Sequence, residues 1–132
     1  MSDGLTVLIV DDSEMVRKRL RALVDDVAGV RVVGEAGGLG EARAALEAVR
    51  PDVVVLDLRL GDGSGLELLR EMGPCRLAPR VIVLSNEAWP QYRRECMTAG
   101  ADWFFDKTDE FHRVPEVLAA EAAAGFDGPG WG

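Results

Sequence analysis

The feature that most limits the fold of this sequence is a series of five short apolar runs, each followed by a helix-like pattern. The runs are rich in β-branched or aromatic residues, too short for helices, and continuous rather than interrupted by polar residues. Such runs are typical of strands that are buried on both faces, as in parallel sheets. They lie at residues 8–10 with their neighbours, 30–36 (the weakest), 53–56, 81–84 and 103–105.

Apolar residues spaced by three and four predict a helix after each run. Asp12 or Ser13 is expected to cap the first helix. Pro90 suits the first turn of the fourth helix and Gly100 its end, while the fifth helix is expected to start near Val114. The spacings run through Val16, Leu20, Leu23, Val24 and Val27; Leu39, Ala42, Leu46 and Val49; Leu66, Leu68, Leu69 and Met72; Trp89, Tyr92, Arg93 and Cys96; and Val114, Val117, Leu118 and Ala122.

A strand followed by a helix, repeated five times, predicts an α/β fold. The sheet is then parallel and doubly wound, with helices on both faces and right-handed crossovers. The chain has 132 residues, which is the size of one domain. We place that domain at residues 4–122 and expect the Gly- and Pro-rich tail at 123–132 to be disordered.

Charge and hydropathy exclude several classes of protein. The formal net charge of -8 argues against a general nucleic-acid or membrane-surface binder, because both need basic patches. It is compatible with a bound cation or with a partner that has a basic face. No segment approaches the ~20 apolar residues of a membrane span, and the first residues lack a signal-peptide pattern. We therefore expect a cytoplasmic protein.

Polar side chains follow four of the five predicted strands. Asp11 and Asp12 follow the first strand, Asp57 the third, Ser85 the fourth and Lys107 the fifth. Ligands of open α/β sheets bind beyond the carboxyl ends of the strands. Taken singly, each residue is an ordinary cap, turn or surface residue, but together they predict one site at one edge of the sheet.

The residue types at this edge suit phosphoryl chemistry on a metal. Carboxylates are the hard oxygen ligands that Mg²⁺ prefers, and the ion would neutralise their clustered charge. Without it, mutual repulsion should raise the pKa of at least one carboxyl group. Asp57 can then attack phosphorus and form an acyl phosphate. Lys107 would offset negative charge on the transferred group, while the Ser85 hydroxyl binds a phosphoryl oxygen.

The segments VLIVDDSEMVRKRL, PDVVVLDLRLGDGSGLELL, RVIVLSN and GADWFFDKT closely resemble the receiver domain of two-component response regulators. The resemblance covers roughly residues 5–120. It implies a flavodoxin-like (βα)5 fold with a five-stranded parallel sheet in the order 2-1-3-4-5. It also implies that a phosphoryl group at the site alters the face formed by the fourth helix, fifth strand and fifth helix, which partners read.

The resemblance assigns a role to each site residue. These are Asp57 as phosphoacceptor; Asp11, Asp12, Asp57 and the backbone carbonyl of Arg59 as ligands of Mg²⁺, for which Mn²⁺ substitutes; Ser85 and Phe104 as the switch pair; and Lys107 as the phosphate-binding residue. Four positions depart from the family pattern. Asn86 replaces the small residue usual after the switch hydroxyl, which is expected to narrow access to the phosphoryl group. Gly61 stands where proline is common, which suggests a more mobile loop. Thr108 replaces the proline after Lys107, so the family's cis peptide would cost about 3 kcal/mol. Phe104 lacks the hydroxyl of a tyrosine, so packing alone separates its inward and outward states.

Arg59 and Glu87 lie two positions after Asp57 and Ser85 respectively, so both should flank the mouth of the site. We expect them to pair across it, or Arg59 to contact the phosphoryl group. Either arrangement would hinder an attacking water molecule and lengthen the phosphorylated lifetime.

We therefore predict a single-domain response regulator, which is a signalling protein and not an enzyme. It would take a phosphoryl group from a histidine kinase or histidine phosphotransfer protein, signal to a protein partner, and contact neither nucleic acid nor membrane. The alternative is a small Mg²⁺-dependent phosphatase with Asp57 as nucleophile, although no segment is long enough to form a substrate cap. A flavin binder is a third possibility, but Asp11 and Asp12 would repel the flavin phosphate.

Overall fold

The computed structural model describes residues 4–73 and 79–124. Five parallel strands form one sheet in the order β2-β1-β3-β6-β7. This is the predicted order 2-1-3-4-5 when only the strands of this sheet are counted. The strands are β1 (Leu5–Val10), β2 (Val30–Ala36), β3 (Val53–Leu56), β6 (Arg80–Ser85) and β7 (Trp103–Asp106). The helices are α1 (Glu14–Asp25), α2 (Leu39–Val49), α3 (Gly65–Met72), α4 (Pro90–Thr98) and α5 (Arg113–Ala123).

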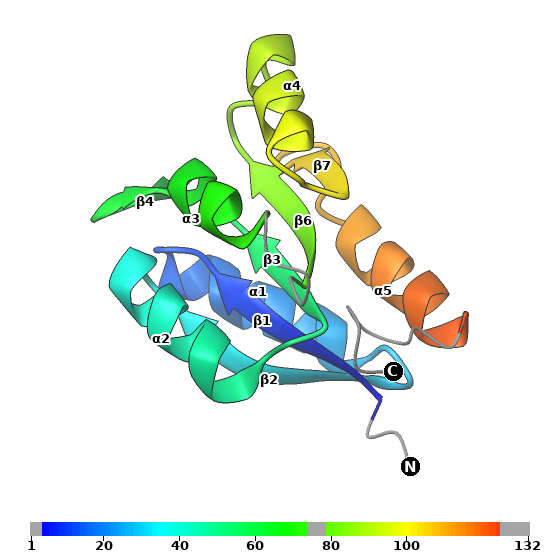
Figure 1. The fold of residues 1–132 in the computed structure, drawn as a ribbon. Helices are drawn as coiled ribbons and strands as arrows, with labels where there is room; N and C mark the ends of the chain where they lie inside the picture. The colour runs from blue at the N-terminus through cyan, green and yellow to red at the C-terminus, as the bar shows by residue number, and fades with distance from the viewer. Residues whose placement is uncertain (1–3, 74–78, 125–132) are drawn as a thin grey trace.

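Helices cover both faces of the sheet (Figure 1). On one face, α2, α3 and α4 pack on a core that includes Leu8, Leu56 and Phe104. On the other, α1 and α5 pack on a second core that includes Ile9 and Ile82. All four residues of β3 are buried, because this central strand contacts helices on both sides. The doubly wound α/β architecture is therefore confirmed.

The helix ends follow the predicted signals closely. The Ser13 hydroxyl caps α1 by accepting a hydrogen bond from the Val16 N–H at 3.2 Å. Pro90 opens α4, and Gly100 follows its end with φ at +114°, a conformation that favours glycine. The fifth helix starts at Arg113, one residue before the expected position.

A short hairpin between β3 and α3 is absent from the sequence-based prediction. It pairs β4 (Arg59–Leu60) with β5 (Gly63–Ser64) in antiparallel register. Gly61 thus lies in the turn of a defined hairpin, and the mobility expected of this loop stays a prediction. The hairpin follows Asp57 directly and forms one wall of the site described below.

The predicted tail falls mainly on residues 125–132, outside the described residues. The proposed domain boundary at residue 122 lies one residue before the end of α5. Within residues 4–73 and 79–124, no helix has the length and hydropathy needed to cross a bilayer.

Candidate functional site

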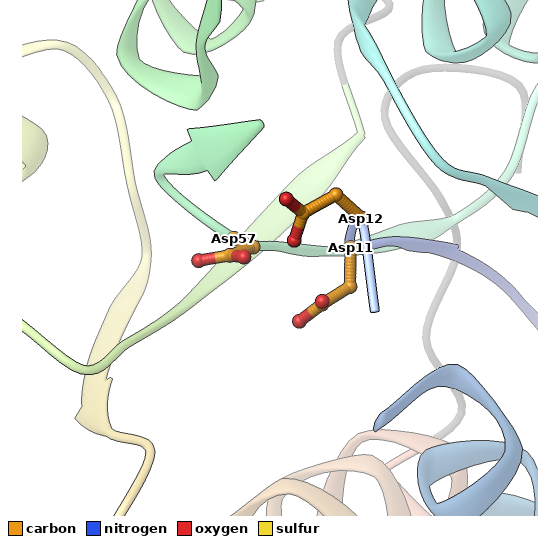
Figure 2. Close-up of side chains that lie close together, drawn as sticks. All are labelled: Asp11, Asp12 and Asp57. Atoms are coloured by element: carbon orange, nitrogen blue, oxygen red, sulfur yellow. The ribbon is translucent and has the colours of Figure 1, made fainter. Parts of the chain in front are cut away.

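Three carboxylates meet at the carboxyl edge of the sheet (Figure 2). Asp11 and Asp12 follow β1, and Asp57 follows the neighbouring strand β3. One oxygen from each lies within 4.8 Å of the other two. Asp11 and Asp57 are only 2% and 6% exposed, whereas Asp12 is exposed. The predicted acidic cluster is therefore present, with two buried acids and one open to solvent.

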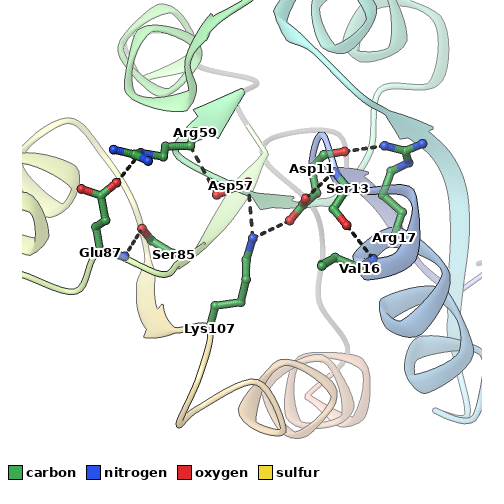
Figure 3. A network of polar contacts seen from close by, with 9 residues as sticks. All are labelled: Asp11, Ser13, Val16, Arg17, Asp57, Arg59, Ser85, Glu87 and Lys107. Atoms are coloured by element: carbon green, nitrogen blue, oxygen red, sulfur yellow. Dashed lines mark hydrogen bonds and ion pairs between the residues drawn. The ribbon is translucent and has the colours of Figure 1, made fainter. Parts of the chain in front are cut away.

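Lys107 joins the two buried acids (Figure 3). Its Nζ donates to Asp11 Oδ2 at 2.8 Å and lies 3.3 Å from Asp57 Oδ2. Its backbone N–H donates to the Ser85 carbonyl at 2.8 Å, which fixes the end of β7 beside β6. One ammonium thus neutralises part of the charge of two buried carboxylates, as burial of such groups requires.

The peptide bond between Lys107 and Thr108 is trans. The sequence left open whether the family's cis peptide persists at this position, and the structure has the trans form. The physical reason is that threonine gives none of the cis preference of proline. The Thr108 N–H instead donates to Asp106 Oδ1 at 2.8 Å, which forms a tight turn after β7.

Backbone amides orient both buried carboxylates. The Ser13 N–H donates to Asp11 Oδ1 at 2.8 Å, and the Arg59 N–H donates to Asp57 Oδ1 at 3.3 Å. Arg17, which was not predicted as a site residue, donates to the Asp11 carbonyl at 2.6 Å and pairs with Glu35. The only sequence signal for it is an arginine one turn into the helix that follows the acidic pair.

Burial raises the pKa of the Asp57 carboxyl group above its ordinary value of 3.8. The Asp11 carboxylate raises this pKa further, whereas the Lys107 ammonium and the Arg59 amide lower it. We expected repulsion between carboxylates to raise a pKa at this site. The rise is present, but loss of solvent contributes more to it than the neighbouring charge does.

In metal-free buffer, Asp57→Asn is expected to be more stable than the wild type at neutral pH. Because the folded-state pKa of Asp57 is raised, the folded protein binds this proton more tightly than the unfolded chain does. The wild type therefore loses stability as pH rises from 3.8 through the folded-state pKa. Urea unfolding across this pH range should show that the free energies of unfolding of Asp57→Asn and the wild type differ little at low pH. The advantage of Asp57→Asn should grow as pH rises. A difference that is independent of pH would contradict this origin.

Ser85 and Phe104, the predicted switch pair, lie on neighbouring strands. Ser85 is buried at the end of β6, and its hydroxyl accepts from the Glu87 N–H at 3.0 Å. Phe104 is buried opposite Val83, with the Arg93 guanidinium 5.0 Å from its ring centroid. Arg93 also donates to the Phe104 carbonyl at 3.2 Å, which links α4 to β7.

Arg59 and Glu87 form an ion pair, as one of the two sequence-based alternatives predicted (Figure 3). The Arg59 side chain is 83% exposed, so the pair lies at the surface. Both residues line a pocket of about 490 Å³ together with Asp12 and Ser85. The pair therefore joins β4 to the residues after β6 beside the pocket that Asp12 and Ser85 also line.

The fold and this arrangement of acids and lysine define a response regulator receiver domain. The family model for this domain matches residues 7–119, and the chain belongs to the family. Receiver domains of two-component systems are signalling phosphoacceptors that take phosphoryl groups from kinases and typically use Mg²⁺.

Known proteins similar to this chain include whole regulators of different kinds. The chain is 40% identical over 101 residues to the DNA-binding transcriptional activator DevR/DosR of Mycobacterium tuberculosis, covering 76% of this chain and 46% of that protein. It is 35% identical over 107 residues to a protein-glutamate methylesterase/protein-glutamine glutaminase of Treponema denticola, covering 80% and 29%. The response regulator domain of Thermotoga maritima CheB superposes with a TM-score of 0.79 at 27% identity, covering 92% of this chain and 95% of that domain. This chain thus spans less than half the length of these two curated relatives.

The donor set at the sheet edge fits a magnesium-sized ion. The cluster offers only carboxylate oxygens, and two of its three members are buried and already oriented by amides. Mg²⁺ prefers such hard ligands and retains several waters, which the exposed Asp12 permits.

Proposed function

We propose that this chain is a phosphoryl-operated switch that accepts a phosphoryl group on Asp57 from a histidine kinase or histidine phosphotransfer protein. It then signals to a protein partner through the face formed by α4, β7 and α5. The observation that carries the proposal is the buried pair Asp11 and Asp57 bridged by Lys107. A purely structural role gives no reason to bury two acids against one base, because such burial is costly.

In the proposed reaction, a carboxylate oxygen of Asp57 attacks the phosphorus of phosphohistidine. The new O–P bond forms as the P–N bond breaks, and its electron pair returns to the imidazole nitrogen. Asp11, Asp12, Asp57 and the Arg59 backbone carbonyl would hold Mg²⁺ or Mn²⁺, which supplies charge neutralisation to the phosphoryl oxygens. The Lys107 ammonium, already beside Asp57, provides a second positive charge at the acyl phosphate.

The proposed switch uses Ser85 and Phe104. In this structure the Ser85 hydroxyl accepts a hydrogen bond from the Glu87 amide. In the phosphorylated state it would donate a hydrogen bond to a phosphoryl oxygen. A shift of the end of β6 would reach Phe104 on the paired strand β7, and through Arg93 it would reach α4. Trp89, which is 60% exposed just before α4, is a candidate contact for the partner.

A stoichiometry measurement tests the proposed function against the phosphatase alternative. Incubation with Mg²⁺ and acetyl phosphate should add one phosphoryl group per chain by intact mass. Generic phosphate monoesters should not be hydrolysed catalytically, because Leu58 and Arg59 rather than an acid follow Asp57, and no described segment is long enough to form a substrate cap. Many turnovers of p-nitrophenyl phosphate with no stable adduct would instead favour the phosphatase.

Breaking the Arg59–Glu87 ion pair is expected to shorten the lifetime of the phosphorylated state. Because both side chains line the pocket beside Ser85, we expect loss of the pair to open a path for attacking water. Because exposed pairs are worth about 1 kcal/mol or less, we expect Arg59→Ala and Glu87→Ala to accelerate dephosphorylation about fivefold or less. Phosphoryl loss after donor removal can be followed by intact mass. The exposed pair Arg70–Glu95 provides matched controls, Arg70→Ala and Glu95→Ala. Equal rates in all four variants and the wild type would refute this role.

We further propose that the protein is a single-domain regulator in the cytoplasm and that it does not contact nucleic acid directly. The negative charge of the chain supports a protein partner rather than DNA. The relatives named above raise a second possibility, in which the same domain regulates a DNA-binding or methylesterase part of a longer protein. Binding of a labelled DNA library, with and without acetyl phosphate, would distinguish the two.

A further inference from the structure

The hairpin that follows Asp57 is too short to fix its own position. Each of its strands, β4 and β5, has only two residues, and isolated hairpins are marginally stable at best. Yet this hairpin carries the Arg59 amide that donates to Asp57 Oδ1. Contacts with the rest of the chain must therefore determine where the Arg59 backbone lies relative to Asp57.

The carboxylate of Asp62, in the turn of the hairpin, makes such a contact with the start of α2. It accepts hydrogen bonds from the Leu39 N–H at 2.7 Å and the Gly40 N–H at 3.4 Å. The N-cap residue of this helix is Gly38, which has no side-chain oxygen. The first amides of α2 are thus capped by the hairpin rather than by their own segment, and the negative charge also suits the positive end of the helix dipole.

The packing around this contact requires small residues. A Cβ atom at Gly38 would lie 2.8 Å from Asp62 Oδ1, closer than real Cβ contacts allow. A Cβ atom at Gly63, whose φ is +154°, would collide with the side chain of Leu39. The hairpin and α2 therefore approach each other closely at the two glycines. The buried side chain of Leu60 also holds the hairpin, because it packs into the hydrophobic core.

We propose that Asp62 is a positioning residue: by capping α2 it fixes the hairpin, and thereby the Arg59 backbone beside Asp57. The proposed function enters only in the assumption that the Arg59 carbonyl is a ligand of the divalent ion. Asp62 lies beyond the acidic cluster of Asp11, Asp12 and Asp57 and acts on it through the hairpin backbone alone.

The variant Asp62→Ala should loosen the hairpin and weaken ion binding. Hydrogen exchange of the peptide that contains residues 58–63 is expected to accelerate, because the tether to α2 is lost. The Mg²⁺ dissociation constant, measured by isothermal titration calorimetry, is expected to rise about tenfold, as for other residues that support a metal ligand indirectly. Asp62→Asn retains one acceptor oxygen and should lie between Ala and wild type in both measurements.

A second substitution separates positioning from helix stability. In Asp62→Ala/Gly38→Ser, the new hydroxyl can cap α2 from within its own segment, and removal of the carboxylate frees the space for the Cβ atom. Asp62→Ala should lower the urea midpoint, because α2 loses its cap. The proposal predicts that the added Gly38→Ser restores the midpoint, whereas fast exchange at residues 58–63 and weak Mg²⁺ binding persist. Recovery of all three would overturn it, because Asp62 would then serve only to stabilise α2. Unchanged exchange in Asp62→Ala would also overturn it.

Failure of the proposed function gives a different result. In that case wild-type protein would show no Mg²⁺ response and no phosphoryl gain, whereas the exchange measurement would still report whether Asp62 holds the hairpin.

Discussion

Replacement of Asp57 by asparagine is expected to abolish the gain of a phosphoryl group from acetyl phosphate in the presence of Mg²⁺. The amide lacks the anionic oxygen that attacks phosphorus, and no other carboxylate in the part of the chain that the structure describes has the same environment. Asp11 is also buried, but the Ser13 amide and Lys107 both hold it at 2.8 Å, whereas the Arg59 amide and Lys107 lie 3.3 Å from Asp57. Asp12 is exposed. Intact-mass measurement over time gives the rate directly.

The matched control for this prediction is Asp109→Asn, the same chemical change at an exposed aspartate beyond the three-carboxylate cluster. It should phosphorylate at the wild-type rate. Asp57→Asn is also expected to remain folded, because it removes a carboxylate whose ionisation is disfavoured by burial. Phosphorylation of Asp57→Asn at the wild-type rate would place the acceptor elsewhere and refute the assignment.

Replacement of Lys107 by methionine is expected to destabilise the metal-free protein by about 3 kcal/mol at neutral pH. The substitution leaves two buried carboxylates without their shared positive charge, and loss of one partner of a buried ion pair typically costs this much. Without the ammonium, the folded-state pKa of Asp57 rises further, since Lys107 lowers it in the wild type. The stability deficit should therefore shrink on acidification.

Urea unfolding in chelator, at neutral and mildly acidic pH, checks the Lys107 prediction. The chain contains one other lysine, Lys18, which is exposed on α1, so Lys18→Met is the matched control and should unfold like the wild type. Added Mg²⁺ should restore part of the stability of Lys107→Met, because binding to the folded state shifts the equilibrium. A deficit equal to that of Lys18→Met would mean that the bridge contributes little.

Most of the fold could be predicted from the sequence because each strand of the main sheet carries a local signal. All four of residues 53–56 are apolar, with no alternation of polar residues. This pattern is typical of a strand that is covered by helices on both faces. The β4–β5 hairpin has no such signal. Its two-residue strands are too short for any periodicity, and contacts such as that of Asp62 with Leu39 come from 23 positions away.

The positions of the site residues could be predicted, but not their mutual contacts. Asp11, Asp57 and Lys107 each follow a strand of the parallel sheet. All strands of a parallel sheet end at the same edge, so the proximity of these residues follows from topology. The bridging of both acids by one ammonium depends on side-chain conformation, as does the Arg17 contact with the Asp11 carbonyl. A raised pKa of at least one carboxyl group at this site was expected from charge, whereas the larger cause of the raised pKa of Asp57 is burial, which only the packed fold reveals.

The central claim is that the carboxylates of Asp11, Asp12 and Asp57 bind a divalent ion, which prepares Asp57 to take a phosphoryl group. Its most direct test is to map the modified residue after treatment with acetyl phosphate and borohydride trapping, in Mg²⁺ and in chelator. Trypsin releases a peptide ending at Arg59 that contains Asp52 and Asp57, and fragmentation distinguishes the two. We predict modification of Asp57 in Mg²⁺ and almost none in chelator. Modification at another residue, or equal modification of Asp57 without the ion, would contradict the claim.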